Sequence, residues 1–244
     1  MARRWCLLHG LGATGAVWHP VAQRLQARGD DVFLPDLAGH GRAAPLEHYT
    51  VAGLADALRA SAIPMMDTVL VGHSLGGYVA LALADARGGA APLGVLMLGT
   101  KLAFSDEERA RGRDLAGRPA RAFATHAEAL ERYRKVAGLD RSISSDVAVL
   151  DRGVLLSDAG WQLSMDPGGN ATVVPPMAEL LEHVRCPVAA ACGAEDPMVT
   201  VEALRALVPT AQGFPALGHN AQVEDPDRIL AWMDQFVAGL TPLS

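Results

Sequence analysis

A serine set between glycines is the residue in this chain with the clearest chemical potential. Residues 72–77 have the sequence Gly-His-Ser-Leu-Gly-Gly, after the apolar run Thr68 to Val71 and before an Ala- and Leu-rich stretch. A G-x-S-x-G pattern between a strand and a helix is typical of a nucleophile elbow, a strained turn that exposes a serine hydroxyl above a sheet. The glycines keep Cβ atoms out of the crowded turn. We therefore expect Ser74 to act as a nucleophile.

A histidine and an aspartate further along the chain can complete such a site. A serine hydroxyl needs a base to take its proton, and an imidazole base needs a carboxylate to fix its tautomer. Asp196 follows an apolar run that ends at Cys192, and His219 lies in a loop before the last helical pattern. The chain order serine, aspartate, histidine is the one that accompanies this type of elbow. Glu195 and Asp106 are alternative acids, and we favour Asp196.

The sequence His-Gly-Leu-Gly at residues 9–12 can supply an oxyanion hole. Two backbone N–H groups must converge on the oxygen that becomes negative during acyl transfer. One is expected from the residue after the nucleophile, Leu75, and the other from the loop after a neighbouring strand, Leu11 by position. Gly10 suits a backbone that approaches the substrate closely. His40 and His73 are interpreted as packing or loop-stabilising residues.

Short apolar runs alternate with helical patterns, as expected for strands of a buried parallel sheet with helices on both faces. The expected strands are Trp5–Leu8, Val32–Leu34, Thr68–Val71, Val95–Leu98, Val188–Cys192 and a weaker one at Gln212–Phe214. The expected helices are Val17–Arg28, Val51–Ala60, Ser74–Arg87, Val201–Leu207 and Pro226–Val237. The sequence thus predicts an α/β fold.

Residues 101–176 interrupt this alternation. The segment has no clear buried strand, is helical in character, and carries about half of the Lys and Arg residues of the chain. We expect residues 1–100 and 177–244 to form the core, and residues 101–176 to form an inserted helical cap over one end of the sheet.

Composition and charge restrict the possible partners. The net charge is −6 and the basic residues are mixed with acids, which argues against a nucleic-acid partner. The three cysteines show neither a disulfide framework nor metal-ligand spacing, and no His/Asp/Glu cluster has metal spacing. No apolar stretch approaches the roughly 20 residues of a membrane span, and the first residues lack signal-peptide features. We expect a cytoplasmic protein without a metal or a membrane partner.

Together these motifs resemble the α/β-hydrolase superfamily. The resemblance covers most of the chain outside residues 101–176 and includes Pro35 to Gly41 in addition to the motifs above. It implies a Ser–His–Asp triad, no cofactor and a helical cap. The first strand begins within five residues of Met1, so the sheet should have about six strands and lack an N-terminal hairpin. Ser74 excludes the branches that use an aspartate nucleophile, epoxide hydrolases and haloalkane dehalogenases.

The expected function is hydrolysis of a carboxylic ester, thioester or lactone of a small molecule through an acyl-enzyme. The alternatives are a cofactor-free lyase, a C–C hydrolase or a dioxygenase on the same triad, and a ligand receptor with little turnover. Burst kinetics on an activated ester and a search for products other than acid and alcohol would separate them. The side chains expected to line the substrate pocket are Leu11, Leu75, Tyr78, Phe104, Phe123, Trp161, Met198, Val199 and Leu217.

Overall fold

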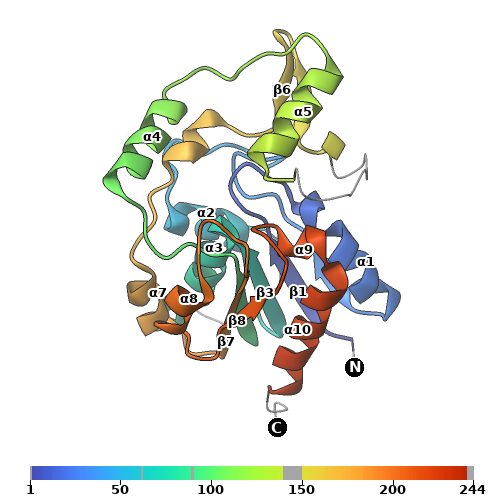
Figure 1. Ribbon diagram of the computed structural model, residues 1–244, viewed down its shortest axis with the longest axis vertical. Helices are drawn as coiled ribbons and strands as arrows, with labels where there is room; N and C mark the ends of the chain where they lie inside the picture. Colours follow the sequence, from blue (N-terminus) through green and yellow to red (C-terminus); the bar gives the residue numbers. More distant parts are fainter. Residues whose placement is uncertain (1, 62, 89–90, 140–149, 241–244) are drawn as a thin grey trace.

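The computed structural model describes residues 2–61, 63–88, 91–139 and 150–240, and a parallel sheet runs through its centre (Figure 1). The sheet has six strands, in the spatial order β2 (Asp31–Phe33), β1 (Arg4–Leu8), β3 (Thr68–His73), β4 (Gly94–Leu98), β7 (Val188–Gly193) and β8 (Gln212–Phe214). All neighbouring strands pair in parallel. The expected α/β fold with a parallel sheet of six strands is confirmed.

Alternate side chains of the strands point to opposite faces of the sheet and form two separate hydrophobic cores, one on each face. In β1, Trp5 and Leu7 point into one core, and Cys6 and Leu8 point into the other. The first core is covered by α1 (His19–Ala27), α9 (Ala221–Glu224) and α10 (Pro226–Ala238). The second is covered by α2 (Val51–Arg59), α3 (Leu75–Leu83), α7 (Met177–His183) and α8 (Val201–Arg205). Burial on both faces explains why the strands are continuous apolar runs.

Polar residues fix where several of these helices begin. The Thr50 hydroxyl accepts a hydrogen bond from the Gly53 amide at the start of α2, and the Asp225 carboxylate accepts one from Arg228 at the start of α10. Each such cap satisfies an amide that the first turn of a helix leaves free, which stabilises the helix by about 1 kcal/mol. The fold also contains two short 3₁₀ helices, η1 (Gly15–Trp18) before α1 and η2 (Ala86–Gly88) after α3.

The 101–176 segment lies between β4 and α7 and contains more than helices. Its helices are α4 (Asp106–Ala116) and α5 (His126–Val136), and each begins with a capping box. Strands β5 (Val154–Ser157) and β6 (Gly160–Leu163) then form an antiparallel hairpin, followed by η3 (Pro167–Ala171). The expectation of a helical segment is therefore wrong for residues 154–163, which form two short strands that are mostly not buried. Each strand has only four residues, too few for a readable alternation of apolar and polar positions.

Buried and half-buried polar contacts attach this segment to the sheet domain, the part of the chain that contains the six-stranded sheet and the helices on its two faces. Arg152 lies 3.2 Å from the carboxylate of Asp36, whose side chain is only 6% exposed. The Tyr49 hydroxyl donates a hydrogen bond of 2.9 Å to Asp166. Figure 1 shows α4, α5 and β6 above the sheet, on the side opposite to the chain termini. The segment is thus held in place over one end of the strands.

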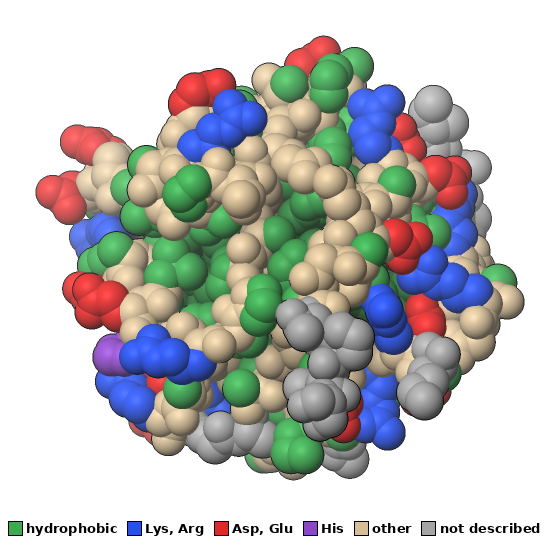
Figure 2. Space-filling view, turned by 90° about the horizontal axis from the view of Figure 1, so that it is seen from below, with side chains coloured by type: hydrophobic (Ala, Val, Ile, Leu, Met, Phe, Trp, Pro, Cys, Tyr) green, Lys and Arg blue, Asp and Glu red, His purple; other side chains and the backbone are tan. Residues whose placement is uncertain are grey.

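Charged side chains are mixed on the molecular surface. Figure 2 shows acidic and basic groups side by side around an area of apolar side chains on the face seen from below. Among the helices that the structure describes, none combines the length and the apolar character that crossing a bilayer requires.

Candidate active site

Ser74 lies at the carboxyl end of β3, in the tight turn between β3 and α3, and its backbone conformation is strained. Its φ of 51° and ψ of −117° are unusual for a residue with a side chain. A Cβ at Gly72 would lie 2.1 Å from the Gly76 carbonyl oxygen, and one at Gly76 would lie 2.5 Å from the Leu8 carbonyl oxygen. Both positions therefore require glycine, as the motif predicts. The turn places Ser74 at the N-terminus of α3, where helix amides and the helix dipole favour negative charge.

His219 and Asp196 meet in the loops that follow β8 and β7. His219 Nδ1 donates a hydrogen bond of 2.8 Å to Asp196 Oδ2. The Asp196 side chain is fully buried, and its second oxygen accepts a hydrogen bond from the Met198 amide at 2.8 Å. The Glu195 side chain is exposed, and so is Asp106 in the first turn of α4. Of the three candidate acids, Asp196 is the one hydrogen-bonded to His219.

His73 connects the turn at Ser74 to the loop that carries His219. Its Nε2 donates a hydrogen bond of 2.9 Å to the His219 carbonyl oxygen, and the two rings lie 4.7 Å apart between centroids. Burial lowers the pKa of His73 well below its ordinary value, so the ring stays neutral with its proton on Nε2. His73 therefore ties the backbone of the candidate base to the nucleophile turn.

The loop after β1 approaches Ser74 closely. A Cβ at Gly10 would lie 3.1 Å from the Ser74 Cβ and 3.0 Å from His73 Nδ1. Within the part of the chain that the structure describes, the backbone amides of Leu11 and Leu75 have no hydrogen-bond partner. Two unpaired amides flanking a serine are what an oxyanion hole requires.

Two buried histidines hold this loop in place. His9 Nδ1 donates to the Gly10 carbonyl oxygen at 2.8 Å, and its Nε2 accepts from the Leu37 amide at 2.9 Å. His40 Nε2 accepts from the Gly12 amide at 3.2 Å. Burial lowers the pKa of His9 to about 3 and also lowers the pKa of His40, so both rings are neutral. A neutral ring can accept and donate at once, which is how each histidine joins two loop segments.

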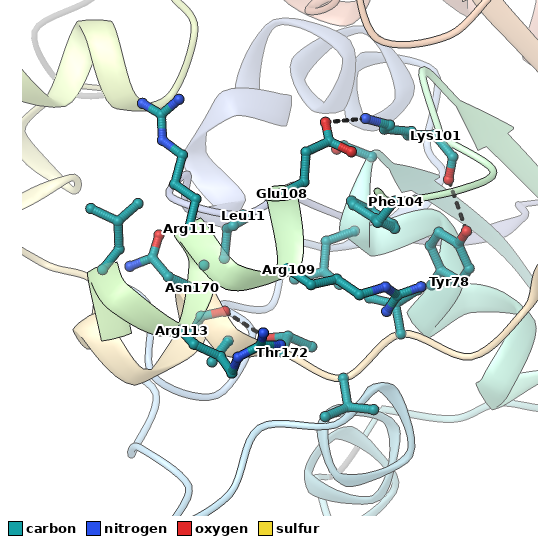
Figure 3. A pocket seen from close by; sticks show the side chains of 18 of the residues that line it. Leu11, Tyr78, Lys101, Phe104, Glu108, Arg109, Arg111, Arg113, Asn170 and Thr172 are labelled. Atoms are coloured by element: carbon teal, nitrogen blue, oxygen red, sulfur yellow. Dashed lines mark hydrogen bonds and ion pairs between the residues drawn. The ribbon is translucent and has the colours of Figure 1, made fainter. Parts of the chain in front are cut away.

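Ser74 opens into a pocket of about 510 Å³ between the sheet domain and the 101–176 segment. The sheet domain contributes Leu11, Ser74, Leu75, Tyr78 and Met198. Residues from 101 to 115 on and before α4, and residues 169–174 in and after η3, form the remaining walls. Figure 3 shows Tyr78, Phe104 and Arg109 together at one side of this pocket.

Four of the residues expected to line the pocket lie elsewhere. Phe123 and Trp161 pair with each other through backbone hydrogen bonds of 2.7 and 3.0 Å, and the buried Phe123 packs beside the β5–β6 hairpin. Val199 belongs to the core that α2, α3, α7 and α8 cover, and Leu217 belongs to the opposite core. These four residues do not line this pocket, and the sequence does not show which face of the segment meets Ser74. Leu11, Leu75, Tyr78, Phe104 and Met198 do line the pocket.

The wall formed by α4 and residues 169–174 was not expected from the sequence. A Cβ at Gly112 would lie 2.5 Å from the Asn170 carbonyl oxygen, so a glycine inside α4 permits close packing of the helix on η3. Glu108, Gly112 and Leu115 all line the pocket, and their spacing of four and three residues places them on one helix face. That spacing, with a glycine inside a charged helix, is the signal that could have identified the wall.

Among the described residues, no group of three or more His, Cys, Asp and Glu side chains is arranged to hold a metal ion. Burial raises the pKa of the Cys6 thiol to about 12 and that of Cys192 to about 11. These thiols are therefore protonated at neutral pH and poor nucleophiles.

Comparison with known proteins places the chain in a family. It matches the model of the alpha/beta hydrolase family over residues 7–232. The chain therefore belongs to this family, as its motifs, parallel sheet and serine turn suggest, and membership supports hydrolase activity as the class of function.

Individual relatives are more distant. An uncharacterised protein of Mycobacterium tuberculosis is 40% identical over 81 residues, 32% of this chain and 24% of that protein. The lipase LipV of the same organism is 39% identical over 82 residues, 33% of this chain and 31% of LipV. The alignments thus span only a quarter to a third of these curated relatives.

Solved structures share the architecture over nearly the whole chain. The thioesterase domain from the curacin biosynthetic pathway has a TM-score of 0.78 at 22% identity, covering 95% of this chain and 90% of that domain. An esterase of M. tuberculosis has a TM-score of 0.78 at 18% identity, covering 97% of this chain and 86% of the esterase. Identities this low show a shared fold.

Proposed function

We propose that this chain is a serine hydrolase that cleaves a carboxylic ester, thioester or lactone of a small molecule through an acyl-enzyme intermediate. The observation that carries the proposal is the hydrogen bond of 2.8 Å between His219 Nδ1 and the fully buried carboxylate of Asp196. That bond leaves Nε2 of His219 unprotonated and able to act as a base. The strained turn at Ser74 and the unpaired amides of Leu11 and Leu75 support the same assignment.

In the proposed mechanism, the Ser74 hydroxyl oxygen attacks the substrate carbonyl carbon while His219 Nε2 takes the hydroxyl proton. The carbonyl oxygen becomes negative and accepts hydrogen bonds from the amides of Leu11 and Leu75. Collapse of this intermediate breaks the bond to the leaving group, which takes the proton from His219. Water then attacks the acyl-enzyme, His219 takes its proton and returns it to Ser74, and the acid product leaves. Asp196 holds the imidazole tautomer and stabilises the imidazolium at each stage.

We further propose that the 101–176 segment acts as a cap that restricts access to Ser74. It supplies one wall of the pocket, and Arg152 and Asp166 attach it to the sheet domain. A covered pocket excludes water from the reacting groups and strengthens their electrostatic interactions. The apolar side chains beside Ser74, including Leu11, Leu75 and Met198, suit the hydrocarbon part of a substrate.

The proposal is tested by reaction with a fluorophosphonate probe, followed by peptide mapping of the labelled site. We expect stoichiometric labelling at Ser74, none in the Ser74→Ala variant, and unchanged labelling in Ser61→Ala, which alters an exposed serine away from the pocket. Incubation with a panel of esters and thioesters should release acid and alcohol or thiol in equal amounts, and each lactone should open to a single hydroxy acid. Labelling at another serine would overturn the assignment, and products of another kind would favour lyase, C–C hydrolase or dioxygenase chemistry.

A further inference from the structure

Helix α4 gives the pocket an excess of positive charge. Three arginines of this helix, Arg109, Arg111 and Arg113, line the pocket together with Lys101 from the preceding loop. Glu108 is the one acidic residue of the lining, and its carboxylate forms an ion pair with Lys101. The charges of Lys101 and Glu108 offset each other, so the positive charges of the three arginines remain uncompensated in the lining.

The three arginines have no acidic partner within the part of the chain that the structure describes. The guanidinium carbon of Arg109 lies 5.9 Å from the centroid of the Phe104 ring. Figure 3 shows Arg109 reaching from α4 toward Tyr78 and Phe104, and Arg113 beside Thr172. Burial raises the pKa of Tyr78 to about 12, and the positive charge of Arg109 acts on it in the opposite direction. Arg109 therefore presents its charge at the apolar end of the pocket.

The neighbouring surfaces do not neutralise these charges. Residues 169–174, which pack beside α4 and form part of the same pocket wall, contain no ionisable side chain. Asp106 and Glu107 belong to the first turn of α4 and are not part of the lining. Arg109 and Arg113 are four residues apart and therefore lie on the same side of α4. Two unpaired guanidinium groups on one side of a helix that lines the pocket point to an anionic ligand.

We propose that the substrate carries an anionic oxyacid group, a carboxylate or a phosphate, at a distance from the scissile carbonyl, and that Arg109 and Arg113 bind it. This inference rests on the proposed function and adds the class of substrate. The planar guanidinium matches the two oxygens of a carboxylate or phosphate. The apolar surface of Leu11, Leu75 and Met198 beside Ser74 then holds the hydrocarbon that joins the anion to the reacting ester.

Two matched substrate pairs test the inference and show on which side of the ester the anion lies. The first pair is the p-nitrophenyl monoester of adipic acid and p-nitrophenyl hexanoate, which differ by a carboxylate on the acyl chain. The second pair is the butyrate esters of 4-hydroxybutyl phosphate and of hexan-1-ol, which differ by an anion on the alcohol. For at least one pair we expect kcat/KM to be about tenfold or more higher for the charged member, since hydrogen bonds to charged groups are the strong ones.

The arginine variants connect that preference to α4. In Arg109→Gln and Arg113→Gln the ratio of charged to neutral kcat/KM should fall severalfold, and in the double variant it should approach one. Arg109→Lys should retain part of this ratio, because lysine keeps the positive charge but lacks the planar guanidinium that donates two parallel hydrogen bonds. Arg118→Gln is the matched control. Arg118 lies just after the end of α4, forms an ion pair with Asp114 and does not line the pocket. In the wild-type protein the preference should decline as NaCl is raised.

Two outcomes overturn the inference while the proposed function stands: Ser74 is labelled and neutral esters are cleaved, but neither charged substrate is preferred; or the preference survives in the Arg109→Gln, Arg113→Gln double variant. If Ser74 is not labelled and no ester is cleaved, the proposed function itself fails and the inference falls with it.

Discussion

Individual residues of the proposed site depend on backbone positions that tolerate little change. Ser74 keeps a φ of 51° because the turn between β3 and α3 is packed directly against the end of β1. The strain is maintained by the surrounding sheet and is a property that functional turns often share. A Cβ atom added at Gly76 would contact the backbone at the end of β1, whereas one added at Gly77 would contact the side chain of Thr100.

Gly76→Ala should therefore destabilise the protein and disturb Ser74. The new methyl would lie 2.5 Å from the Leu8 carbonyl oxygen and 2.7 Å from that of His9, which neither backbone can avoid without moving. We expect a loss of about 1–3 kcal/mol in the free energy of unfolding, measured by urea denaturation, and slower fluorophosphonate labelling. Gly117→Ala is the control, because its nearest contact would be an ordinary 3.6 Å. Equal stability of the two variants would contradict the packing argument.

Asp196→Asn should test the acid of the proposed triad. An asparagine amide at this position favours the wrong tautomer of His219, so kcat should fall by about 10⁴, while the fold remains intact. Glu195→Gln and Asp106→Asn change neighbouring or alternative carboxylates and should keep near wild-type rates on the same activated ester. An active Asp196→Asn variant beside an inactive variant of either alternative would reassign the acid.

At the scale of elements, two phenylalanines of the 101–176 segment have different surroundings. Phe104 precedes α4 and lines the pocket, whereas Phe123 is buried beside the β5–β6 hairpin and pairs with Trp161. Both are phenylalanines of the same segment, so they separate an effect on substrate choice from an effect on stability.

Phe104→Ala should change the order of preference across a series of p-nitrophenyl esters from acetate to decanoate, since the enlarged pocket accommodates longer or bulkier acyl chains. Phe123→Ala should leave that order unchanged and lower the free energy of unfolding by about 3–5 kcal/mol, because the ring is nearly fully buried. The measurements are kcat/KM across the series and urea denaturation of both variants. A changed order in Phe123→Ala alone would mean that the pocket extends to the hairpin.

For the whole molecule, the sequence predicts the sheet far better than the pocket. The six strands lie within about two residues of their predicted positions, because burial on both faces makes each strand a continuous apolar run. Ser74 was identified because the glycines that its turn requires are local in sequence. The pocket wall depends on which face α4 turns toward η3, and none of the residues of α4 is buried. A helix without a buried stripe gives no hydrophobic signal of its orientation, and only the spacing around Gly112 marks the face that packs on η3.

The buried histidines predict how the stability of the molecule depends on pH. His9, His40 and His73 all have a pKa lowered chiefly by burial, to about 3 for His9, from an ordinary value of 6.5. Below pH 6.5 the unfolded chain therefore binds protons that the folded protein does not, and the folded state loses stability as the pH falls. Each histidine contributes a slope of up to about 1.4 kcal/mol per pH unit. This loss continues down to the lowered pKa of the folded state.

We expect the free energy of unfolding, measured by urea denaturation between pH 7.5 and 4.5, to fall steeply below pH 6.5. The part of this range above about pH 5 lies above the pH at which most carboxylates titrate, so the histidines dominate the change there. His40→Gln removes one of the three groups and should give a shallower slope even if its stability at pH 7.5 is lower. His48→Gln, which alters an exposed ring, should keep the wild-type slope. A wild-type stability that stays constant from pH 6.5 to 5 would mean that these rings are protonated in the folded protein. The Leu37 and Gly12 amides, which donate to His9 and His40, would then need a different hydrogen-bond arrangement.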